Sequence, residues 1–171
     1  MNTLAKRISG FTLIELMVTV AVMGIILAWG IPSFRNLLQN TRATSQANEF
    51  ITSVNQARTE ALKRQSTVSV IAAAGGTATN EFGNGWSVVV DADGDGVVDA
   101  GDVRVATSTG YQGRGTLNSV NNVSAFTFQR DGTLGAVRGF EVRIPDCRGT
   151  AARNISISRI GHVSVASVAC Q

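Results

Sequence analysis

Chemical groups that usually carry catalysis are scarce in this sequence. It contains one histidine, His162, and two cysteines, and their spacing is not that of a metal site. A Gly-x-Ser-x-Gly nucleophile motif and a glycine-rich phosphate-binding loop are both absent. Internal repeats and low-complexity linkers are absent as well. The sequence therefore indicates a protein that is not an enzyme.

Charge is nearly absent from residues 11–31, where Glu15 is the only ionisable side chain. The other residues are mostly large and apolar, and the run matches the ~20 residues that a helix needs to cross a bilayer. Lys6 and Arg7 precede the run without an acid, which favours a cytoplasmic N-terminus. A secretory signal peptide is the alternative, although its apolar core of roughly 7–15 residues is shorter. We expect a membrane-spanning helix, with the chain after Pro32 outside the cytoplasm.

Glycine and proline are missing from residues 33–64, and helical periodicity continues there. Pro32 removes one backbone donor, so it should kink the helix without ending it. We predict one helix from about Phe11 to Arg64, which is amphipathic over residues 33–65 and continues into the globular domain. Its apolar stripe consists of Phe34, Leu37, Leu38, Ala47, Phe50, Ile51, Val54, Ala57, Ala61 and Leu62.

Residues 66–171 have the composition of an antiparallel β domain. Short apolar or alternating runs are separated by glycine, asparagine and aspartate, as in strands joined by turns. Because the helical stripe and the sheet can cover each other's apolar faces, we predict an α+β domain. The expected strands are residues 67–71, 85–90, 103–106, 123–128, 139–144, 154–158 and 163–165.

The two cysteines, Cys147 and Cys170, both lie near the C-terminus. In an oxidising compartment they could form a disulfide that closes a loop of about 23 residues. Closing such a loop is worth about 3 kcal/mol in a chain-entropy estimate. The disulfide would tether the end of the chain. Two free, buried cysteines are the alternative.

Five aspartates are spaced as in a calcium-binding loop. With Asp91 at position one, acids occupy positions one, three, five, nine and twelve, and Gly96 occupies position six. The last acid is not the usual glutamate, and strands rather than helices are expected on both sides. A Ca²⁺ site and a solvated acidic hairpin loop therefore both stay open. The candidate ligands are Asp91, Asp93, Asp95, Asp99 and Asp102.

The segment Gly10-Phe-Thr-Leu-Ile-Glu-Leu16, after a short basic leader and before an apolar helix, resembles the class III signal of type IV pilins and type II secretion pseudopilins. The downstream chain is similar to the FimT/GspH group of minor pilins and pseudopilins. The resemblance covers essentially the whole chain and implies a type IV pilin-like fold, a long N-terminal helix packed on a C-terminal antiparallel sheet domain. The similar downstream segments are residues 85–86, 91–96, 128–132, 146–149 and 155–161.

The resemblance implies that residues 1–10 are a leader peptide. A prepilin peptidase would cleave between Gly10 and Phe11 and N-methylate Phe11. Cleavage gives a physical reason for Glu15, because a carboxylate at membrane depth costs a few kcal/mol unless a cation meets it. In pilins the corresponding carboxylate is thought to meet the amino terminus of a neighbouring subunit, so Phe11 and Glu15 are the predicted subunit contact. The alternative is a Glu15 side chain that only extends to the membrane interface.

The resemblance further implies a FimT/FimU-like minor pilin that helps to start fibre assembly near the tip of a type IV pilus, in twitching motility, adhesion or natural transformation. Its partners would be other minor pilins, the major pilin, the prepilin peptidase and the inner-membrane assembly platform. The protein would begin as a single-pass inner-membrane protein with a periplasmic C-terminal domain, and end in the fibre. A GspH-like pseudopilin of type II secretion is the alternative.

Arginines concentrate in the distal part of the chain. Residues 11–102 hold five basic and nine acidic side chains, whereas residues 103–171 hold eight arginines and three acids. DNA binding during uptake is one hypothesis, because some FimT-like proteins bind DNA through a C-terminal Gly-Arg-x-Arg pattern. Here that place reads Gly161-His162-Val163-Ser164, without the two arginines. Solvated or ion-paired arginines are the alternative. The candidates are Arg143, Arg148, Arg153 and Arg159.

Overall fold

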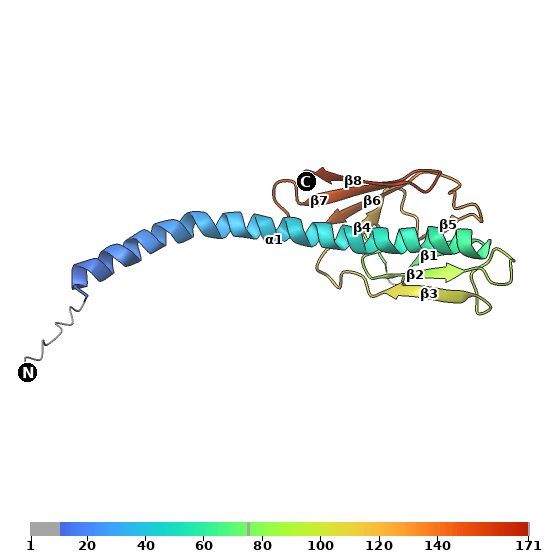
Figure 1. Ribbon diagram of the computed structural model, residues 1–171, viewed down its shortest axis with the longest axis horizontal. Coiled ribbons are helices and arrows are strands. Elements are labelled where there is room, and N and C mark those ends of the chain that lie inside the picture. The colour runs from blue at the N-terminus through green and yellow to red at the C-terminus, as the bar shows by residue number, and fades with distance from the viewer. Residues whose placement is uncertain (1–10, 75, 171) are drawn as a thin grey trace, which may run out of the picture. The chain divides into compact units, whose positions relative to one another are not determined.

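The computed structural model describes residues 11–74 and 76–170 of the 171-residue chain. These residues form one helix, α1, and eight strands, β1 to β8 (Figure 1). They divide into two compact units between Leu37 and Leu38. The first unit contains the beginning of α1, and the second contains the rest of α1 together with all the strands.

The long helix expected from the sequence is confirmed, since α1 spans Leu13–Arg64. It continues through Pro32 without ending there. Lys63 and Arg64 lie in its last turn, where positive charge interacts favourably with the helix dipole. The next residue, Gln65, adopts a left-handed conformation with φ 53°, which ends the helix and turns the chain toward β1.

The strands form two antiparallel sheets, which the sequence did not distinguish. The first sheet has the order β3-β2-β1-β5 and the second the order β4-β6-β7-β8. The expected strands all have counterparts, but the sequence pattern does not reveal β4, because Thr-Leu-Asn-Ser is short and holds one large apolar residue. The bounds are β1 Val68–Ala72, β2 Trp86–Val90, β3 Val103–Ser108, β4 Thr116–Ser119, β5 Ala125–Phe128, β6 Arg138–Arg143, β7 Ala152–Ile157 and β8 Val163–Val168.

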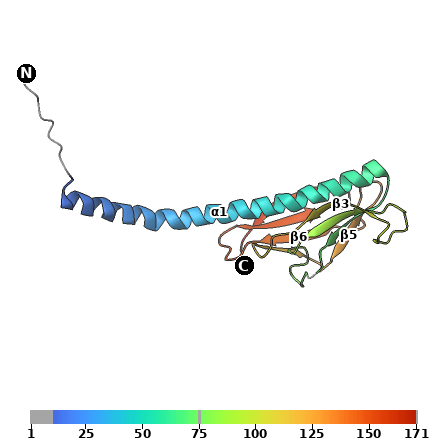
Figure 2. The ribbon, with the colours of Figure 1, turned by 90° about the horizontal axis from the view of Figure 1, so that it is seen from below.

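The second unit buries one stripe of α1 against the strands, which lie along one side of the helix in Figure 2. Phe50 is at the centre of this stripe, with the ring centroids of Phe82, Trp86, Phe126 and Phe140 at 4.8–6.4 Å from its own. Small alanines on either side let the helix backbone approach the sheets closely. The buried residues of the stripe are Ala43, Ala47, Phe50, Val54, Ala57 and Ala61.

Both ends of the predicted stripe are corrected by the structure. Phe34, Leu37, Leu38 and Leu62 are 40–61% exposed, so they do not belong to the core. Burial of the stripe begins at Ala43, because the globular unit covers the helix only from that region onward. Helical periodicity alone could not locate this limit, since the apolar spacing is the same on both sides of it.

A buried carboxylate fastens the loop between β1 and β2 to the edge of β4. Glu81 is 7% exposed, and its two carboxylate oxygens accept hydrogen bonds from the amides of Thr79 (3.0 Å) and Ser119 (2.9 Å). The side-chain oxygen of Asn80 accepts a hydrogen bond from the amide of Leu117 at 2.9 Å. Loop residues thus satisfy the backbone donors of β4 that would otherwise lie on an open sheet edge.

Replacing the central aromatic ring should weaken the whole globular unit. We expect Phe50→Ala to lower the free energy of unfolding by about 3–5 kcal/mol, because it removes a fully buried ring and leaves a cavity. Asn48→Ala, at an exposed position of the same helix, should change it by less than about 0.5 kcal/mol. Denaturant unfolding of residues 38–171, followed by circular dichroism, measures both. Equal losses for the two variants would contradict this packing.

Candidate functional site

The N-terminus of α1 brings Phe11 and Glu15 to the start of the apolar helix. Thr12 precedes the helix, and its hydroxyl accepts a hydrogen bond from the Glu15 amide at 3.3 Å. This N-cap satisfies one of the free amides of the first turn. Thr12 is a residue that sequence reasoning missed, and the Thr-x-x-Glu spacing of a capping box is the signal that could have found it.

Residues 11–31 present apolar side chains on every side of the helix. Their large apolar residues are exposed by fractions between 48% for Ile31 and 84% for Phe11. The helix contains an 18-residue stretch of mean hydropathy 2.2, none of it buried, which is long and apolar enough to cross a membrane. An exposed apolar surface of this extent marks a membrane or protein contact. Gly10 lies outside the described residues, so cleavage after it stays a prediction.

The expected disulfide between Cys147 and Cys170 is present, with the two Cα atoms 5.6 Å apart. It joins the loop before β7 to the chain after β8, where the Cys170 amide donates a hydrogen bond to the Gly149 carbonyl (2.9 Å). In the same loop, the backbone carbonyl of Asp146 accepts a hydrogen bond from the side-chain amide of Gln39 on α1 (2.9 Å). The disulfide therefore holds the end of the chain next to a loop that contacts α1.

Arg153 belongs to the interior, which removes it from the predicted nucleic-acid surface. It is 6% exposed, and its guanidinium donates hydrogen bonds to the backbone carbonyls of Thr150 and Ala152, each at 2.9 Å. The same group donates to the side chains of Asn40 and Thr44 on α1. Because an arginine with these partners cannot turn toward a phosphate, its role is to join β7 to the helix.

The three other candidate arginines do not form one patch. Arg143 on β6 pairs with Glu141, with its Nε 2.8 Å from a carboxylate oxygen. Arg148 and Arg159 are exposed, but they lie before and after β7, which is six residues long. A strand of that length spans about 20 Å, so the two side chains start from opposite ends of it. DNA binding stays a prediction that none of these contacts tests.

The predicted calcium loop forms the connection between β2 and β3. Asp91, Asp93 and Asp95 each place a carboxylate oxygen within 4.8 Å of the others. The amides of Gly94 and Gly96 donate hydrogen bonds to the Asp91 carboxylate at 2.7 and 3.1 Å, which folds the loop around it. Gly96 has φ +79°, a left-handed conformation that favours glycine at the sixth position.

The remaining two aspartates face the same loop. The Asp102 carboxylate accepts hydrogen bonds from the amides of Ala92 (3.0 Å) and Asp99 (3.1 Å). A Cβ atom added at Gly101 would lie 3.1 Å from a carboxylate oxygen of Asp93 and 3.1 Å from one of Asp99. The fold thus brings the carboxylates of Asp91, Asp93 and Asp95 together, while Asp99 and Asp102 lie in the same loop outside this group of three.

Negative charges repel one another within this loop. The Asp95 amide donates a hydrogen bond to Asp93, which favours the charged form, but desolvation and the charges of three other aspartates together raise the pKa of Asp93. In contrast, hydrogen bonds from the Thr67 hydroxyl and two backbone amides lower the pKa of Asp91. A divalent cation would offset the repulsion, and Ca²⁺ prefers oxygen ligands in a flexible geometry. The residues therefore fit Ca²⁺, although whether it binds stays a prediction.

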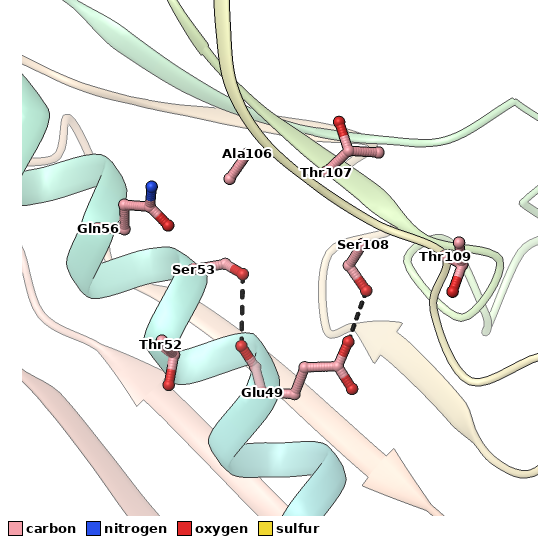
Figure 3. A pocket seen from close by; sticks show the side chains of 8 residues that line it. All are labelled: Glu49, Thr52, Ser53, Gln56, Ala106, Thr107, Ser108 and Thr109. Carbon is pink, nitrogen blue, oxygen red and sulfur yellow. Dashed lines mark hydrogen bonds between the residues drawn. The ribbon is translucent and has the colours of Figure 1, made fainter.

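An open groove lies between α1 and β3 (Figure 3). In that view Glu49 and Ser108 point toward each other, and the Ser108 hydroxyl donates a hydrogen bond to the Glu49 carboxylate at 2.6 Å. The sequence did not indicate this groove, because its two walls come from segments about fifty residues apart. Its volume is about 590 Å³, and it is lined by Glu49, Thr52, Ser53, Gln56, Ala106, Thr107, Ser108 and Thr109.

Comparison with known proteins gives two family matches and a structural likeness. Residues 46–161 match the family described as "Type II transport protein GspH", and residues 5–31 match the prokaryotic N-terminal methylation motif. Two crystal forms of the type IV minor pilin FimU of Pseudomonas aeruginosa have a similar fold, each at 24% sequence identity. In one crystal form the likeness covers 77% of this chain and 94% of FimU, with a TM-score of 0.60. In the other it covers 75% of this chain and 97% of FimU, with a TM-score of 0.57. No curated protein sequence matches the chain.

The long helix packed on antiparallel sheets defines a pilin-like subunit, and the methylation motif with its apolar helix indicates a prepilin-like protein anchored in the inner membrane. The GspH match covers more than half of the chain. The chain therefore belongs to the GspH family of type II pseudopilins and type IV minor pilins. This is a family of structural, non-enzymatic proteins, in agreement with the sequence.

Calcium binding to the β2–β3 loop can be measured on residues 38–171. At a Ca²⁺ concentration of about one hundred times its dissociation constant, stability should rise by about 2.7 kcal/mol, since the ion binds only the folded loop. Acidification should remove the effect, because protonated carboxyl groups no longer bind the ion, and the pKa of Asp93 is raised above its usual value. Asp93→Asn should abolish it, whereas Asp146→Asn, an exposed acid outside the loop, should not. If titration with Ca²⁺ in a calorimeter releases or absorbs no heat, and Ca²⁺ leaves the melting temperature unchanged, the site is excluded.

Removing the buried guanidinium of Arg153 should destabilise the globular unit. We expect Arg153→Ala to lower the free energy of unfolding by about 1–3 kcal/mol, because the buried carbonyl of Ala152 and the part-buried carbonyl of Thr150 lose their donor. The matched control is Arg148→Ala, an exposed arginine of the preceding loop, which should have little effect. Urea titration of both variants makes the comparison. A neutral Arg153→Ala would contradict the structural role.

Proposed function

We propose that the chain is a FimT/FimU-like minor pilin that helps to start assembly of a type IV pilus near its tip. One observation carries this proposal. The segment from residue 11 to 31 exposes its large apolar side chains, and Phe11 lies just before α1, whose first turn holds the carboxylate Glu15. The fold likeness to FimU supports a pilus subunit, and the methylation motif supports processing of the N-terminus.

Each part of the chain has a role in this proposal. Residues 1–10 are the leader that is cleaved, and residues 11–32 are first the membrane anchor and later the filament core. Residues 33–65 form the amphipathic helix that enters the globular domain, and residues 66–171 form its sheets. The buried stripe of α1 fixes the helix to the globular unit, whereas the large apolar side chains of residues 11–31 are exposed and would meet other subunits.

Charge neutralisation drives the subunit contact. Cleavage after Gly10 frees the α-amino group of Phe11, which is a cation at the membrane surface. The Glu15 carboxylate of an adjacent subunit costs a few kcal/mol in lipid when it is unpaired, and less when this cation meets it. A subunit leaving the bilayer is thereby guided into one register. The partners are other minor pilins and the major pilin, with the prepilin peptidase and the inner-membrane assembly platform.

A GspH-like pseudopilin of type II secretion is the second candidate, favoured by the description of the matched family. Both candidates use the same processing and the same carboxylate, so the fold does not separate them. The two candidates can be distinguished by deleting the gene for this chain and then assaying surface pili and secreted enzymes. Loss of pili with normal secretion supports the pilus subunit, and the reverse result supports the pseudopilin.

Removing the membrane carboxylate should block incorporation but not processing. We expect Glu15→Ala to reduce the subunit in isolated fibres by about tenfold or more, since 1.4 kcal/mol of lost contact already gives a factor of ten. Leader cleavage, measured as the mass of the membrane-bound protein, should continue. Immunoblots of sheared fibres and of membranes give the two readouts.

Glu49→Ala is the matched control, because it removes a carboxylate of the same helix from the globular unit. It should still be processed, and incorporation should depend on Glu15 much more strongly than on Glu49. Normal incorporation of Glu15→Ala would contradict the proposed role of the carboxylate.

A further inference from the structure

The four sheet edges of the globular unit differ in how they are protected from other chains. Asn80 and Glu81 cover β4 by accepting hydrogen bonds from two of its amides. The strand β5 is only four residues long, and its last residue, Phe128, bridges to the turn that follows it. Covered or very short strands of this kind resist pairing with a strand of another molecule.

The edge of β3 is protected in two other ways. The pairing register between β2 and β3 shifts between Val88 and Val89, so the ladder is irregular there. Arg104 places an exposed charge within the strand. Irregularities and charged side chains are common in edge strands, because they twist the edge away or oppose the approach of a partner.

The edge of β8, the last strand of its sheet (Figure 1), is regular and uncharged. Val163–Val168 pairs with β7 in an unbroken register and contains no charged residue, glycine or proline. The uncharged run continues through Cys170. Among residues 11–74 and 76–170, no backbone hydrogen bond reaches the outer side of β8. A strand of another chain can add to an edge of this kind.

Alternate residues of β8 direct their backbone groups away from β7. The Ser158 amide donates a hydrogen bond to the His162 carbonyl at 2.9 Å, and hydrogen-bonded pairs alternate along an antiparallel ladder. It follows that Val163, Val165 and Ser167 present their amides and carbonyls to the outside. These groups form a template for one further strand.

The side chains that β8 directs toward the core are incompletely covered. Val165 pairs with the fully buried Ile155, so it lies on the same face of the sheet, but it is 47% exposed. Val163 packs against the core and is only partly buried. A strand added outside β8 would cover both valines, and apolar cross-strand pairs stabilise a sheet. The fitting segment therefore directs β-branched or aromatic side chains toward the core.

Both ends of β8 are held in place. The turn before it is closed by a hydrogen bond from the Gly161 amide to the Ser158 carbonyl at 2.9 Å. After the strand, Cys170 forms the disulfide with Cys147, and its amide donates to the Gly149 carbonyl. The ends of chains are usually poorly ordered unless they are tied down, as this one is. An edge that is ordered in advance lowers the entropic cost of binding.

We propose that β8 is a docking edge in the fibre, to which an extended, uncharged segment of a different pilin subunit adds as a further strand. The added segment pairs with the outward amides and carbonyls of β8 and covers Val163 and Val165. The Cys147–Cys170 disulfide keeps the edge ordered for this partner. The inference rests on the proposed function in one respect, because it takes the neighbours in the fibre as the source of the strand.

Other occupants fit this edge less well. Lipid chains offer no hydrogen-bonding groups to a strand backbone. Nucleic acids bind chiefly through their phosphates, and β8 has no cation to meet them. A second copy of this chain is an uncommon neighbour for a minor subunit, whereas the family implies assembly with other pilins.

Proline at an outward amide tests the backbone pairing in the full chain. The Val165 amide has no acceptor among the described residues, so Val165→Pro should leave the melting temperature of the detergent-solubilised protein nearly unchanged. Its incorporation into sheared fibres should fall about tenfold, as the loss of one or two hydrogen bonds allows. The matched control, Val165→Thr, keeps the amide and the β-branched shape and should be incorporated normally. Val165→Lys keeps the backbone but places a charge on the edge, and it replaces the proline variant if that variant is unstable.

Photocrosslinking identifies the neighbour of the edge. With Ser167→p-benzoylphenylalanine, irradiation of isolated fibres should join this chain to another pilin, and mass spectrometry should place the crosslink in an uncharged segment of it. Adding Val165→Pro should lower the yield about tenfold per chain present in the fibre. The control is Asn154→p-benzoylphenylalanine, at an exposed position of β7, whose products should not respond to the proline.

Three results would overturn the proposal. They are a crosslink from position 167 to a second copy of this chain, no crosslink that depends on Val165→Pro, and normal incorporation of both Val165→Pro and Val165→Lys. Glu15→Ala is scored in the same strains. If one of these results occurs while Glu15→Ala still blocks incorporation, this inference is wrong and the proposed function stands. If Glu15→Ala is also incorporated normally, the proposed function fails as well.

Discussion

The structure depends on how one helix divides its side chains between two environments. From residue 11 to 31 the helix has no polar face, so only a membrane or other helices can cover it. Between Ala43 and Ala61 it has a single narrow stripe, and Phe50 packs there against four other aromatic rings from both sheets and the β1–β2 loop. Since both patterns occur in one element, α1, the anchor and the central packing surface of the globular unit are parts of the same helix.

Glu15 is the only ionisable side chain in the apolar segment of residues 11–31, and its charge gives a physical reason for cleavage of the leader. A carboxylate in an apolar helix is costly until a cation arrives, and cleavage after Gly10 is the step that would create one. The capping contact of Thr12 fixes the start of the helix and with it the position of Glu15. In the proposed function, anchoring, processing and assembly are linked by this single charge.

The sequence predicted the parts of the fold that depend on local pattern. The helix, seven strands and the loop of five aspartates follow from periodicity or spacing, and the disulfide was one of two possibilities for the two cysteines. Contacts between distant segments could not be read in the same way. The interior position of Arg153 depends on Asn40 and Thr44, more than one hundred residues away, and the groove beside Glu49 depends on β3. The edge of β4 is likewise covered by a segment distant in the sequence, because Asn80 and Glu81 accept hydrogen bonds from its amides.

The most direct test of the central claim is the intact mass of the protein purified from bacterial membranes. If Glu15 is matched by a newly formed amino terminus, the mass should equal that of residues 11–171 with the Cys147–Cys170 disulfide and one added methyl group. Fragmentation should place the methyl group on Phe11. A protein that still begins with Met1, in cells that contain an active prepilin peptidase, would contradict the account.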